Sequence, residues 1–368
     1  MRQSHFLISV SFRLTVYHRL RYGRTPTATE RLMPKHTIVL IPGDGIGPEV
    51  TAAAKRVLEA SGLSVEWIEA LAGASAVERG MEDVLPKQTL EAVQHHKIAL
   101  KGPVTTPVGK GFKSVNVQLR QKLNLYAAVR PVRSLPGIKT RFDGVDMVIV
   151  RENTEGLYSG IENEIVPGVV TSLKVASEKA CTRIARYAFR YATKRHRQKI
   201  TVFHKANIMK LSDGLFLNCA RKIWEEEYPN INYEEVIIDA GCMRLVQAPE
   251  KFDVLLMENL YGDLVSDLCA GLVGGLGVVP GSNIGEEVAV FEAVHGSAPD
   301  IAGKGWANPL AIIMSGVMML NHIHEEALGT KIKTAYDAVL AEGKTLTRDL
   351  GGSASTEQFA DAVIGKMK

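Results

Sequence analysis

The sequence predicts an α/β protein in which the strands of a largely parallel sheet alternate with helices. Residues 37–41 are rich in β-branched side chains and lead through the turn PGDGIGPE into a helical pattern, TAAAKRVLEA. A helix signal at 85–96 and a strand signal at 97–100 follow, and apolar strand signals recur at 145–150 and 200–203. Because this alternation is typical of α/β folds, we expect ligands at the carboxyl ends of the strands.

Composition limits the classes of protein that fit. Of the 368 residues, 46% are hydrophobic and 23% are charged, which is typical of a soluble globular protein. A chain of this length is expected to form about two domains. The net charge of +4 is too small to indicate nucleic-acid binding. The most apolar run, 309–323, is shorter than the roughly 20 residues that cross a bilayer, so we expect a buried helix and no membrane segment.

The first 32 residues differ from the rest of the chain. They hold six arginines against a single acid, Glu30, with scattered serine and threonine. An organelle transit peptide has this composition, and the other interpretation is an upstream extension of a gene whose natural start is Met33. We favour a disordered extension on a cytoplasmic protein; a transit peptide would instead imply the mitochondrial matrix. The four cysteines show no paired metal-ligand spacing and fit reduced thiols in a cytosol-like compartment.

Two carboxylates stand out in the segment MENLYGDLVSDLCAGL at 257–272. Asp263 and Asp267 are four residues apart in a helical pattern, so both lie on one face, a turn apart. Their apolar neighbours belong to a buried element, where an ionised carboxylate needs a cation. Mg²⁺ or Mn²⁺ would meet that need. For these two residues alone, the preferred explanation is that one aspartate caps the helix and the other pairs with a lysine or arginine.

The glycine-rich turn at 43–49 joins a strand to a helix, which invites comparison with a dinucleotide-binding site. Its spacing is Gly-x-Gly-x-Gly followed by Pro48, so the third glycine of that fingerprint is absent. The pattern therefore predicts a tight turn and gives little support to a phosphate site.

A polar segment, SVNVQLR, sets Ser114, Asn116 and Arg120 at steps of two and four residues, and Arg130 and Arg151 follow. A guanidinium binds a carboxylate through two parallel hydrogen bonds, so three arginines could hold a substrate that carries several carboxylates. Taken singly, each arginine is better explained as a surface charge. Arg151 differs, because it directly follows an apolar strand, where α/β proteins place their ligands.

Three further residues are candidates for catalysis or metal binding. Tyr158 could act as a general acid, although on its own a half-buried structural tyrosine is the better explanation. Lys205 follows a strand end and is a candidate base or carbonyl polariser, unless it is simply a solvated lysine. Asp239 follows the apolar strand at 236–238 as a third strand-end acid.

Two segments in the middle of the chain predict surface elements. Residues 161–175 alternate apolar and polar side chains around Pro167 and Gly168, which predicts a hairpin of the kind that pairs with a partner subunit. Residues 178–199 interleave lysine and arginine with apolar side chains at helical spacing. This pattern favours a solvated amphipathic helix over a nucleic-acid site.

Seven motifs, in order along the chain, resemble those of the metal-dependent decarboxylating dehydrogenases that include isocitrate and 3-isopropylmalate dehydrogenases. They are GDGIGPE at 43–49, GPVTTP at 102–107, SVNVQLRQKLNLYAAVRP at 114–131, RENTEGLYSG at 151–160, HKANIMKLSDGLF at 204–216, NLYGDLVSDLCAGLVGGLG at 259–277 and HGSAPDIAGKGWANP at 295–309. The resemblance covers nearly everything after Met33. Residues 151–216 are most similar to the NAD-dependent isocitrate enzymes of the family.

The resemblance implies a fold of two α/β domains around a cleft, with a clasp hairpin between subunits near 161–175. The larger, cofactor-side domain would comprise 33–126 and 276–368, and the smaller domain 127–275. The chain would associate with itself as a homodimer or a higher oligomer, with site residues shared across the interface.

The resemblance also implies roles for the matched residues. The substrate-binding arginines would be Arg120, Arg130 and Arg151, and the catalytic acid and base Tyr158 and Lys205. The ligands of Mg²⁺ or Mn²⁺ would be Asp239, Asp263 and Asp267. Of these, Lys205 and Asp239 would reach the site from the neighbouring subunit. The implied reaction is oxidation of a hydroxy-acid with loss of CO₂, in which the metal stabilises developing negative charge and Tyr158 protonates the carbanion carbon.

Isocitrate is the expected substrate. Ser114 and Asn116 resemble the hydroxyl and amide that receive its extra carboxylate, and an apolar isopropyl group against Ser114 would strand polar atoms, at a cost of about 1 to 3 kcal/mol each. Isopropylmalate, homoisocitrate and tartrate are the less favoured substrates. The chain could instead be a non-catalytic regulatory subunit of a hetero-oligomeric isocitrate dehydrogenase, or a tricarboxylate-binding protein. Every matched catalytic position is occupied, which favours the enzyme.

NAD is the expected cofactor. Asp300 can accept hydrogen bonds from the adenosine ribose and would repel a 2′-phosphate. Family members that use NADP are similar to one another in carrying a Lys-Tyr pair at the positions that match 300 and 301. The matched cofactor-binding residues are Thr105, His295, Gly296, Asp300, Ile301 and Asn308. This sequence departs from the family resemblance at Glu258, where many relatives carry proline. The glutamate could alter the surroundings of the metal.

Overall fold

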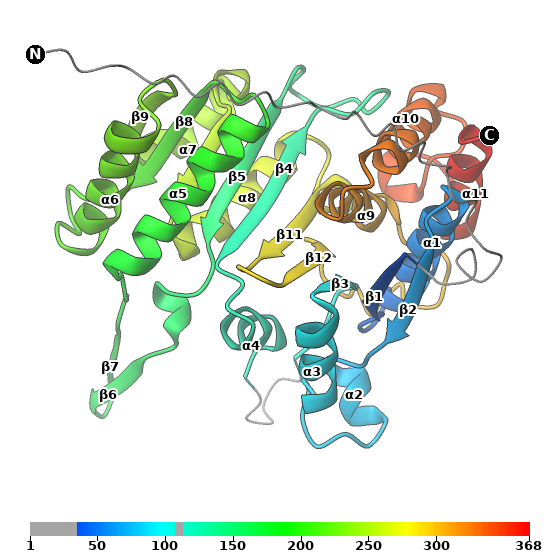
Figure 1. Cartoon of the computed structure of the whole chain (residues 1–368), viewed down its shortest axis with the longest axis horizontal. Coiled ribbons are helices and arrows are strands. Elements are labelled where there is room, and N and C mark those ends of the chain that lie inside the picture. The colour runs from blue at the N-terminus through cyan, green and yellow to red at the C-terminus, as the bar shows by residue number, and fades with distance from the viewer. Residues whose placement is uncertain (1–34, 107–112) are drawn as a thin grey trace, which may run out of the picture. The chain divides into compact units, whose positions relative to one another are not determined.

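The computed structural model describes residues 35–106 and 113–368, so the predicted N-terminal extension lies outside the described residues. Within residues 36–368, ten strands form one mixed sheet in the order β2-β1-β3-β12-β11-β4-β5-β10-β8-β9 (Figure 1). Their bounds in chain order are β1 (His36–Ile41), β2 (Val65–Glu69), β3 (Ile98–Lys101), β4 (Ala127–Arg133), β5 (Asp146–Glu152), β8 (Lys199–His204), β9 (Asn232–Ile237), β10 (Val254–Met257), β11 (Pro280–Ile284) and β12 (Ala289–Ala293).

The sheet is largely parallel, as the sequence predicts. One parallel group contains β2, β1, β3 and β12, and the other contains β5, β10, β8 and β9. Antiparallel pairs join β12 to β11, β11 to β4 and β4 to β5. Three reversals between β12 and β5 mean that the two parallel groups run in opposite directions. The carboxyl ends of the strands therefore lie along two opposite edges of the sheet, and the expectation of ligands at such ends stays a prediction.

The helices alternate with the strands, as expected, and begin close to the predicted positions. Their bounds are α1 (Gly47–Ala60), α2 (Ala74–Glu78), α3 (Lys87–His96), α4 (Val115–Lys122), α5 (Glu178–Lys194), α6 (Ser212–Glu227), α7 (Ile238–Gln247), α8 (Asn259–Leu272), α9 (Leu310–His322), α10 (Glu326–Glu342) and α11 (Thr356–Lys366). Single 3₁₀ turns lie at η1 (Leu157–Ser159), η2 (Pro249–Lys251), η3 (Leu276–Val278) and η4 (Arg348–Leu350).

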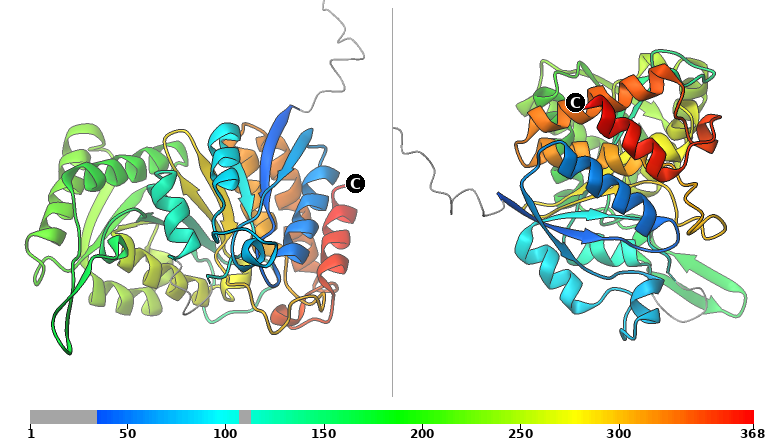
Figure 2. Two further views of the ribbon diagram at one scale, coloured as in Figure 1. Left: turned by 90° about the horizontal axis from the view of Figure 1, so that it is seen from below. Right: turned by 90° about the vertical axis from the view of Figure 1, so that its right-hand side faces the viewer.

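Helices cover both faces of the sheet. Helix α5 contacts β5, β10 and β8 on one face and lies in front of them in Figure 1, while α8 lies behind and contacts β5, β10 and β4. At the other end, α9 packs on β11 and β12, and α1, α10 and α11 pack with it into a helical layer (Figure 2). Helix α9 is buried, as predicted for 309–323. None of the helices in the described part of the chain is long and apolar enough to cross a membrane.

The glycine-rich turn holds two loops against the start of α1. Asp44 accepts hydrogen bonds from the backbone N–H groups of Ser75, at 2.7 Å, and Thr105, at 2.6 Å. Gly45 has a φ of +58°, and a Cβ there would lie 2.0 Å from the carbonyl oxygen of Ser297. Only glycine fits both the conformation and the close approach. The tight turn is therefore confirmed, and α1 then begins with Pro48 in its first turn.

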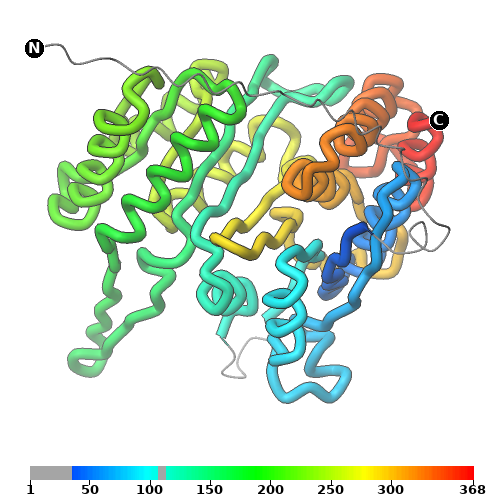
Figure 3. Tube along the Cα trace, in the orientation of Figure 1, coloured from blue at the N-terminus to red at the C-terminus, as the bar shows by residue number. Residues whose placement is uncertain are grey.

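A two-stranded hairpin stands apart from the large sheet, as the alternation at 161–175 predicts (Figures 2 and 3). Its strands are β6 (Glu162–Val166) and β7 (Val169–Ser172), joined through Gly168 at a φ of +83°. The hairpin exposes a row of apolar side chains, with 64% of Ile165 and 63% of Val170 accessible to solvent. An isolated two-stranded hairpin is marginally stable in water, so this row fits a contact with another surface.

The division into two domains stays a prediction. Strands from both sides of the predicted boundaries join in the one sheet, where β11 pairs with β4. A hydrophobic core beneath α5 and α6 involves mainly residues of the predicted smaller domain. The largest core extends from α1, α9 and α11 to α8, and so draws on both predicted domains.

Candidate active site

A pocket of about 130 Å³ lies over the antiparallel centre of the sheet. Its walls come from the end of β3, from α4, from β4 and β11, and from β12 with the segment that follows it. It contains Asn116, Arg120 and Arg130 of the predicted substrate site and His295 and Gly296 of the predicted cofactor site. The reversal of strand direction at β11 and β4 thus brings the two predicted sites to one pocket.

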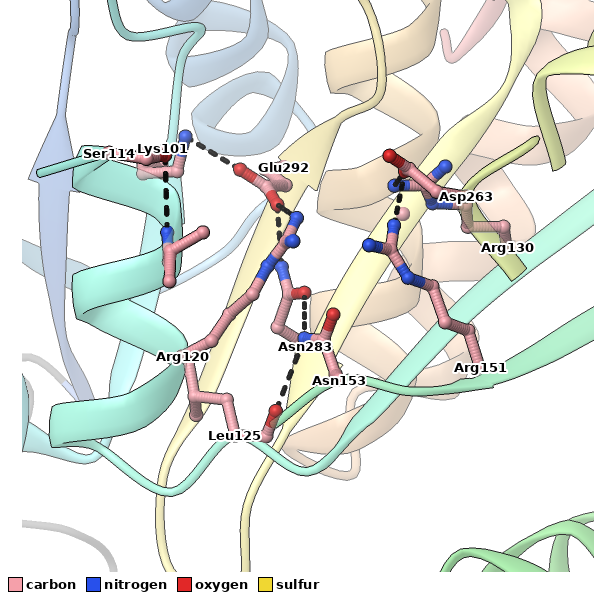
Figure 4. A network of polar contacts seen from close by, with 12 residues as sticks. Lys101, Ser114, Arg120, Leu125, Arg130, Arg151, Asn153, Asp263, Asn283 and Glu292 are labelled. Carbon is pink, nitrogen blue, oxygen red and sulfur yellow. Dashed lines mark hydrogen bonds and ion pairs between the residues drawn. The ribbon is translucent and has the colours of Figure 1, made fainter. Parts of the chain in front are cut away.

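A buried ion pair, not predicted from the sequence, forms one wall of this pocket (Figure 4). The Nζ of Lys101 lies 2.6 Å from Oε2 of Glu292 and donates a hydrogen bond to the carbonyl oxygen of Gly102 at 2.9 Å. Asn283 donates to Oε1 of Glu292 at 2.6 Å, and Asn153 donates to Asn283 at 2.9 Å. Although burial opposes it, the charges of Lys101 and Arg120 lower the pKa of Glu292 to about 2.

Arg120 is the least satisfied cation of the pocket. Its side chain is 10% exposed, Nη2 is 3.9 Å from Oε1 of Glu292, and Nε has no hydrogen-bond partner among the described residues. Oδ1 of the neighbouring Asn116 and Nε2 of His295 are likewise buried without a partner there. Burial, with the charge of Arg151, lowers the pKa of Arg120 to about 10. Buried polar atoms without partners are costly, and a polar ligand in the pocket would give these atoms partners.

The two aspartates of α8 meet the other arginines. Arg130 contacts Ser266, and its Nη1 and Nη2 lie 3.5 Å from Asp267 and Asp263 respectively. Arg151 is fully buried, contacts Asp263, and donates hydrogen bonds to Oδ1 of Asn259 at 2.6 and 3.0 Å. Neither aspartate caps α8, whose N-cap is Glu258, so that half of the preferred explanation is wrong. The other half, a pairing with a cation, holds for both aspartates, and the cations are arginines.

Arg151 lies within β5, whereas the sequence predicts it directly after a strand. Its side chain can lie against α8 because residue 262 is glycine: a Cβ there would be 2.4 Å from Cγ of Arg151. The guanidinium also lies over the ring of Tyr158, 5.1 Å from its centre. The strand, the helix and the η1 turn that holds Tyr158 are thus joined at this arginine.

Tyr158 and Asp263 are in direct contact, with the tyrosine hydroxyl donating to the carboxylate. Burial and this hydrogen bond raise the pKa of Tyr158. Burial would raise the pKa of Asp263 as well, but the charge of Arg151 and the hydrogen bond from Tyr158 hold it below its usual value. Burial raises the pKa of Asp267 against the opposing charge of Arg130. Tyr158 is therefore a protonated donor beside an ionised acid.

The donors on α8 suit a hard divalent cation only in part. Asp263 and Asp267 supply carboxylate oxygens one turn apart, with side chains 34% and 56% exposed. Carboxylate oxygens are ligands that Mg²⁺ and Mn²⁺ prefer, and both ions keep several waters. No group of three acidic, histidine or cysteine side chains able to hold a metal occurs in the part of the chain that the structure describes. One chain thus presents two of the three predicted ligands together.

Asp239 and Lys205 form a separate pair. Nζ of Lys205, which directly follows β8, lies 2.5 Å from Oδ1 of Asp239. The strand predicted at 236–238 ends one residue earlier, so Asp239 belongs to the first turn of α7 rather than to a strand end. The hydrogen bond from Lys205 lowers the pKa of Asp239, whose side chain is 69% exposed. Nearby Ile208 and Leu211 are also exposed, at 69% and 89%.

Ser114 lies outside the lining of the pocket. It caps α4, with Oγ accepting from the backbone N–H of Val117 at 3.4 Å (Figure 4). The cap orients the helix that carries Asn116 and Arg120 into the pocket wall. The structure therefore gives Ser114 a local structural contact, and its contact with substrate stays a prediction.

The predicted cofactor residues lie on two neighbouring loops. Oγ1 of Thr105 is 2.7 Å from Oγ of Ser297, which joins the loop after β3 to the loop after β12. His295 contacts the carbonyl oxygen of Gly296 at 3.0 Å, and burial lowers its pKa, which favours a neutral imidazole. Asp300 is exposed and lies on the same loop as His295.

Two of the predicted cofactor residues have structural contacts. Asn308 donates to Asp349 and accepts from the backbone N–H of Leu310, both at 2.9 Å, so it orders the start of α9. Ile301 packs partly buried against the main core. Sequence reasoning missed Asp44, Lys101 and Glu292, although an acid within the apolar stretch 288–293 and a lysine at a strand end were visible signals.

The mixed sheet and the polar pocket at its centre define an α/β enzyme. More specifically, the chain belongs to the isocitrate/isopropylmalate dehydrogenase family of oxidoreductases, whose sequence model matches residues 37–363. The predicted family and fold class are therefore confirmed.

Similar proteins include both main branches of the family. The chain is 53% identical over 328 residues to the mitochondrial catalytic subunit 5 of NAD isocitrate dehydrogenase from Arabidopsis thaliana, covering 89% of this chain and 87% of the relative. It is 51% identical over 306 residues to the chloroplastic 3-isopropylmalate dehydrogenase of Solanum tuberosum, covering 83% and 85%. The crystal structure of isocitrate dehydrogenase from Methylococcus capsulatus matches with a TM-score of 0.87 and 50% identity, over 90% of this chain and 99% of that chain.

The names of the relatives bear on two further predictions. The Arabidopsis relative is mitochondrial, which agrees with a transit peptide at residues 1–32 and gives no support to a cytoplasmic protein. It is also named as one subunit of an enzyme, so the homodimer stays a prediction.

Proposed function

We propose that the chain catalyses the NAD-dependent oxidative decarboxylation of isocitrate to 2-oxoglutarate and CO₂. The observation that carries the proposal is Arg120, a buried guanidinium with an unpartnered N–H in the pocket wall. A buried cation of this kind needs an anion, and a carboxylate matches its donor geometry. The high identity to named NAD isocitrate dehydrogenase subunits supports the same reaction.

The composition of the pocket favours isocitrate over isopropylmalate. Asn116, Arg120 and Arg130 line it, and Oδ1 of Asn116 is buried without a partner among the described residues. An isopropyl group would leave these donors and acceptors unsatisfied, at a cost of about 1 to 3 kcal/mol each. A third carboxylate would instead give the asparagine and the arginines a partner. The 51% identity to an isopropylmalate dehydrogenase makes that substrate the one to test against.

Two side chains of the protein would move protons in the reaction. The substrate C–H bond breaks as hydride leaves, and the side-chain amine of Lys205 takes up the hydroxyl proton. The C–C bond to the departing carboxylate then breaks to release CO₂, its electron pair remaining on the carbon. Tyr158, whose raised pKa keeps it protonated, donates its proton to that carbon. The arginines hold the remaining carboxylates throughout.

The chain has residues that could hold the cofactor and the metal ion that the reaction needs. Thr105, His295 and Asp300 would hold NAD along their loops, and NAD would supply the hydride acceptor. Mg²⁺ or Mn²⁺, held by Asp263, Asp267 and Asp239 of a second copy, would supply a Lewis acid for developing negative charge on oxygen. The exposed carboxylate of Asp300 supports NAD over NADP, because it would repel a 2′-phosphate.

A second copy of the chain is part of the proposal. Lys205 and Asp239 pair with each other, and among the described residues they form no metal-binding group with Asp263 and Asp267. Exposed apolar side chains lie on the hairpin and near Lys205, where a partner would cover them. We therefore propose a homodimer or larger assembly in which each copy donates this pair to its neighbour.

The test is absorbance at 340 nm with the purified chain, isocitrate, NAD and Mg²⁺ or Mn²⁺. We expect NADH formation that requires the metal, and little with isopropylmalate or with NADP. Asp263→Asn is the control for a metal-dependent reaction and is expected to reduce kcat at least about a hundredfold. Turnover that is unchanged in this variant after chelation of metal would overturn the scheme.

Two other outcomes lead to different functions. Faster turnover of isopropylmalate would move the chain to that branch of the family. No turnover with any substrate, while isocitrate or citrate still binds, would support a regulatory subunit. Calorimetric titration with isocitrate separates this result from a misfolded sample.

The compartment is tested by the N-terminal sequence of the purified protein from its own cell. A start beyond residue 30 would support either cleavage of a transit peptide or initiation at Met33, and the transcript distinguishes the two. A start at Met1 would contradict both.

A further inference from the structure

A partly buried lysine, Lys174, joins the base of the hairpin to two carboxylates. Lys174 lies two residues beyond β7, and its side chain is 15% exposed. Its Nζ is 2.6 Å from Oδ1 of Asp213 and 3.8 Å from Oε2 of Glu258, and 4.6 Å from the centre of the Tyr261 ring. The sequence assigns none of these residues to the site, and Glu258 is the position that departs from the family pattern.

Asp213 connects this lysine to Lys205. The aspartate lies in the first turn of α6 and its side chain is 3% exposed. While Oδ1 faces Lys174, Oδ2 accepts a hydrogen bond of 2.6 Å from the backbone N–H of Lys205. The position of the Lys205 backbone, and with it the Lys205–Asp239 pair, therefore depends on where Asp213 is held.

Glu258 connects the same lysine to the acids of α8. It is the N-cap of that helix and accepts from the backbone N–H groups of Tyr261, at 2.9 Å, and Leu260, at 3.3 Å. A carboxylate at this position is favoured by the helix dipole. Because Asp263 lies in the second turn of the helix, a shift of the cap is passed directly to it.

The charges explain why a cation is needed at this point. Asp213 and Glu258 are both buried, and Lys174 is the one cation that forms ion pairs with both among the described residues. Without it, two like charges would face each other in a poorly solvated space. Removal of one partner from a buried ion cluster is strongly unfavourable, so the carboxylates would move apart.

The hairpin is bonded to the same place. Val175, next to Lys174, pairs with Gly156 in an isolated antiparallel bridge, with hydrogen bonds of 2.9 and 3.3 Å. Gly156 directly precedes the η1 turn of Tyr158. The return strand of the hairpin thus enters the body of the protein beside Tyr158, Lys205 and the cap of α8.

We propose that Lys174 is a positioning residue that fixes Lys205 and the α8 carboxylates relative to each other from the base of the hairpin. The inference rests on the proposed function, since it assigns a consequence to the alignment of those groups. A second copy that pairs with the hairpin would act on Lys174 of the first copy. Through this lysine it would hold in place both the α8 acids of the first copy and the Lys205–Asp239 pair that the first copy donates to its neighbour.

The experiment compares Lys174→Met, Lys174→Arg and Lys179→Met in the full-length chain. Lys179 is an exposed lysine five residues further on, so its variant is the matched control. For Lys174→Met we expect kcat to fall and the half-saturating Mg²⁺ concentration to rise, each by about tenfold, as for outer residues of metal sites. KM for NAD should stay within about twofold of the wild-type value, because the predicted cofactor loops follow β3 and β12, which are separate from the hairpin. Lys174→Arg should recover most of the loss, and Lys179→Met should match the wild type.

Metal binding without turnover gives a second readout. Calorimetric titration of Mg²⁺ in the presence of isocitrate should show the same loss of affinity in Lys174→Met. If the wild-type chain proves inactive, the proposed function fails, and this titration still tests the role of Lys174. Wild-type metal affinity and kcat in Lys174→Met would overturn the inference. A loss of activity in Lys174→Met that is accompanied by an equal rise in KM for NAD, and that Lys174→Arg does not recover, would also overturn the inference.

If Lys174→Met folds poorly, Lys174→Gln takes its place in every comparison, and a double variant then tests the link to Glu258. Glu258→Gln retains an oxygen that can cap α8 but removes the charge that faces Lys174. In the Glu258→Gln background, replacement of Lys174 by Met should change the Mg²⁺ requirement by less than it does in the wild type, because one repulsive partner is already gone. Additive effects of the two substitutions would contradict the proposed link.

Discussion

The ammonium of Lys205 lies 2.5 Å from the carboxylate of Asp239, on elements separate from the helix that carries Asp263. The two groups of candidate site residues are therefore each ordered within one chain. Asp263 is already bound by Tyr158 and Arg151, so neither group depends on the other for its own arrangement. An active site formed by two copies needs only to bring these prearranged groups together.

Mixing two inactive variants tests this arrangement. We expect Lys205→Ala and Asp263→Asn each to be inactive alone, because every site in either homodimer lacks one group. After the two are unfolded and refolded together, random pairing gives hybrid dimers with one intact site, and about a quarter of wild-type activity should return. Activity at 340 nm is the measurement, and refolding each variant alone is the control. If the mixture stays inactive although hybrids form, the residues act within one chain.

Metal and substrate are expected to bind together. Without a cation, Arg151 and Arg130 are engaged by Asp263, and a metal that takes over the carboxylate would free them for substrate. Calorimetry should show isocitrate binding at least about tenfold tighter with Mg²⁺ than without, and by linkage the metal should bind tighter by the same factor.

Substitution of the acid should weaken this coupling. In Asp263→Asn, Arg151 loses its charged partner and Arg130 keeps only Asp267, so isocitrate affinity should depend far less on Mg²⁺. Asp143→Asn, at an exposed acid, is the matched control and should retain the coupling. A Mg²⁺ effect that persists undiminished in Asp263→Asn would place the cation elsewhere.

Stability should depend on acid pH through Glu292. Its pKa is lowered to about 2, so the ionised form stabilises the native state above the ordinary carboxylate value and this contribution is lost as pH falls from about 4.5 towards 2. The free energy of unfolding should decrease by on the order of 3 kcal/mol over that range from this group alone. Urea unfolding followed by circular dichroism at a series of pH values measures it.

Glu292→Gln provides the comparison for that pH series. The variant should lose this part of the pH dependence and be less stable at pH 7, because Lys101 would remain buried without a counter-charge. An equally steep acid dependence in Glu292→Gln would assign the effect to other carboxylates. Lys97→Met removes an exposed ion pair with Glu287 and should change stability by less than about 1 kcal/mol.

Cofactor choice should respond to the charge at residue 300. Replacing Asp300 with Lys removes a repulsive charge and introduces an attractive one for a 2′-phosphate. The ratio of kcat/KM for NADP to that for NAD should rise by about tenfold or more. Glu357→Lys, an equal charge change at an exposed residue of α11, is the control. An unchanged ratio would mean that Asp300 does not face the ribose.

Local patterns predicted the elements that depend on local interactions. The β-branched run before the glycine turn, the continuous apolar run of α9 and the alternation of the hairpin each marked an element. Of these, β1 and α9 are largely buried, whereas the hairpin strands are exposed. Boundaries were less certain, since hydrophobicity does not mark where hydrogen bonding ends. For this reason Arg151 lies inside β5, and Asp239 in the first turn of α7.

Non-local pairing was not predictable in the same way. The antiparallel centre formed by β11 and β4 joins segments far apart in sequence, and nothing in their periodicity shows the reversal. The Lys101–Glu292 pair has the same origin, because each residue alone is an ordinary charge near a strand. Asp263 and Asp267 do lie beside predicted arginines, but Asp239 pairs with Lys205, and Ser114 caps a helix outside the pocket lining.

The glycine beneath Arg151 sets how near an acidic helix can come to a basic strand. With no side chain at residue 262, the two elements touch over the stem of the arginine, and its head meets Asp263. Even a single methyl group at residue 262 would force β5 and α8 apart, so the glycine sets how closely the Arg151 guanidinium meets the Asp263 carboxylate.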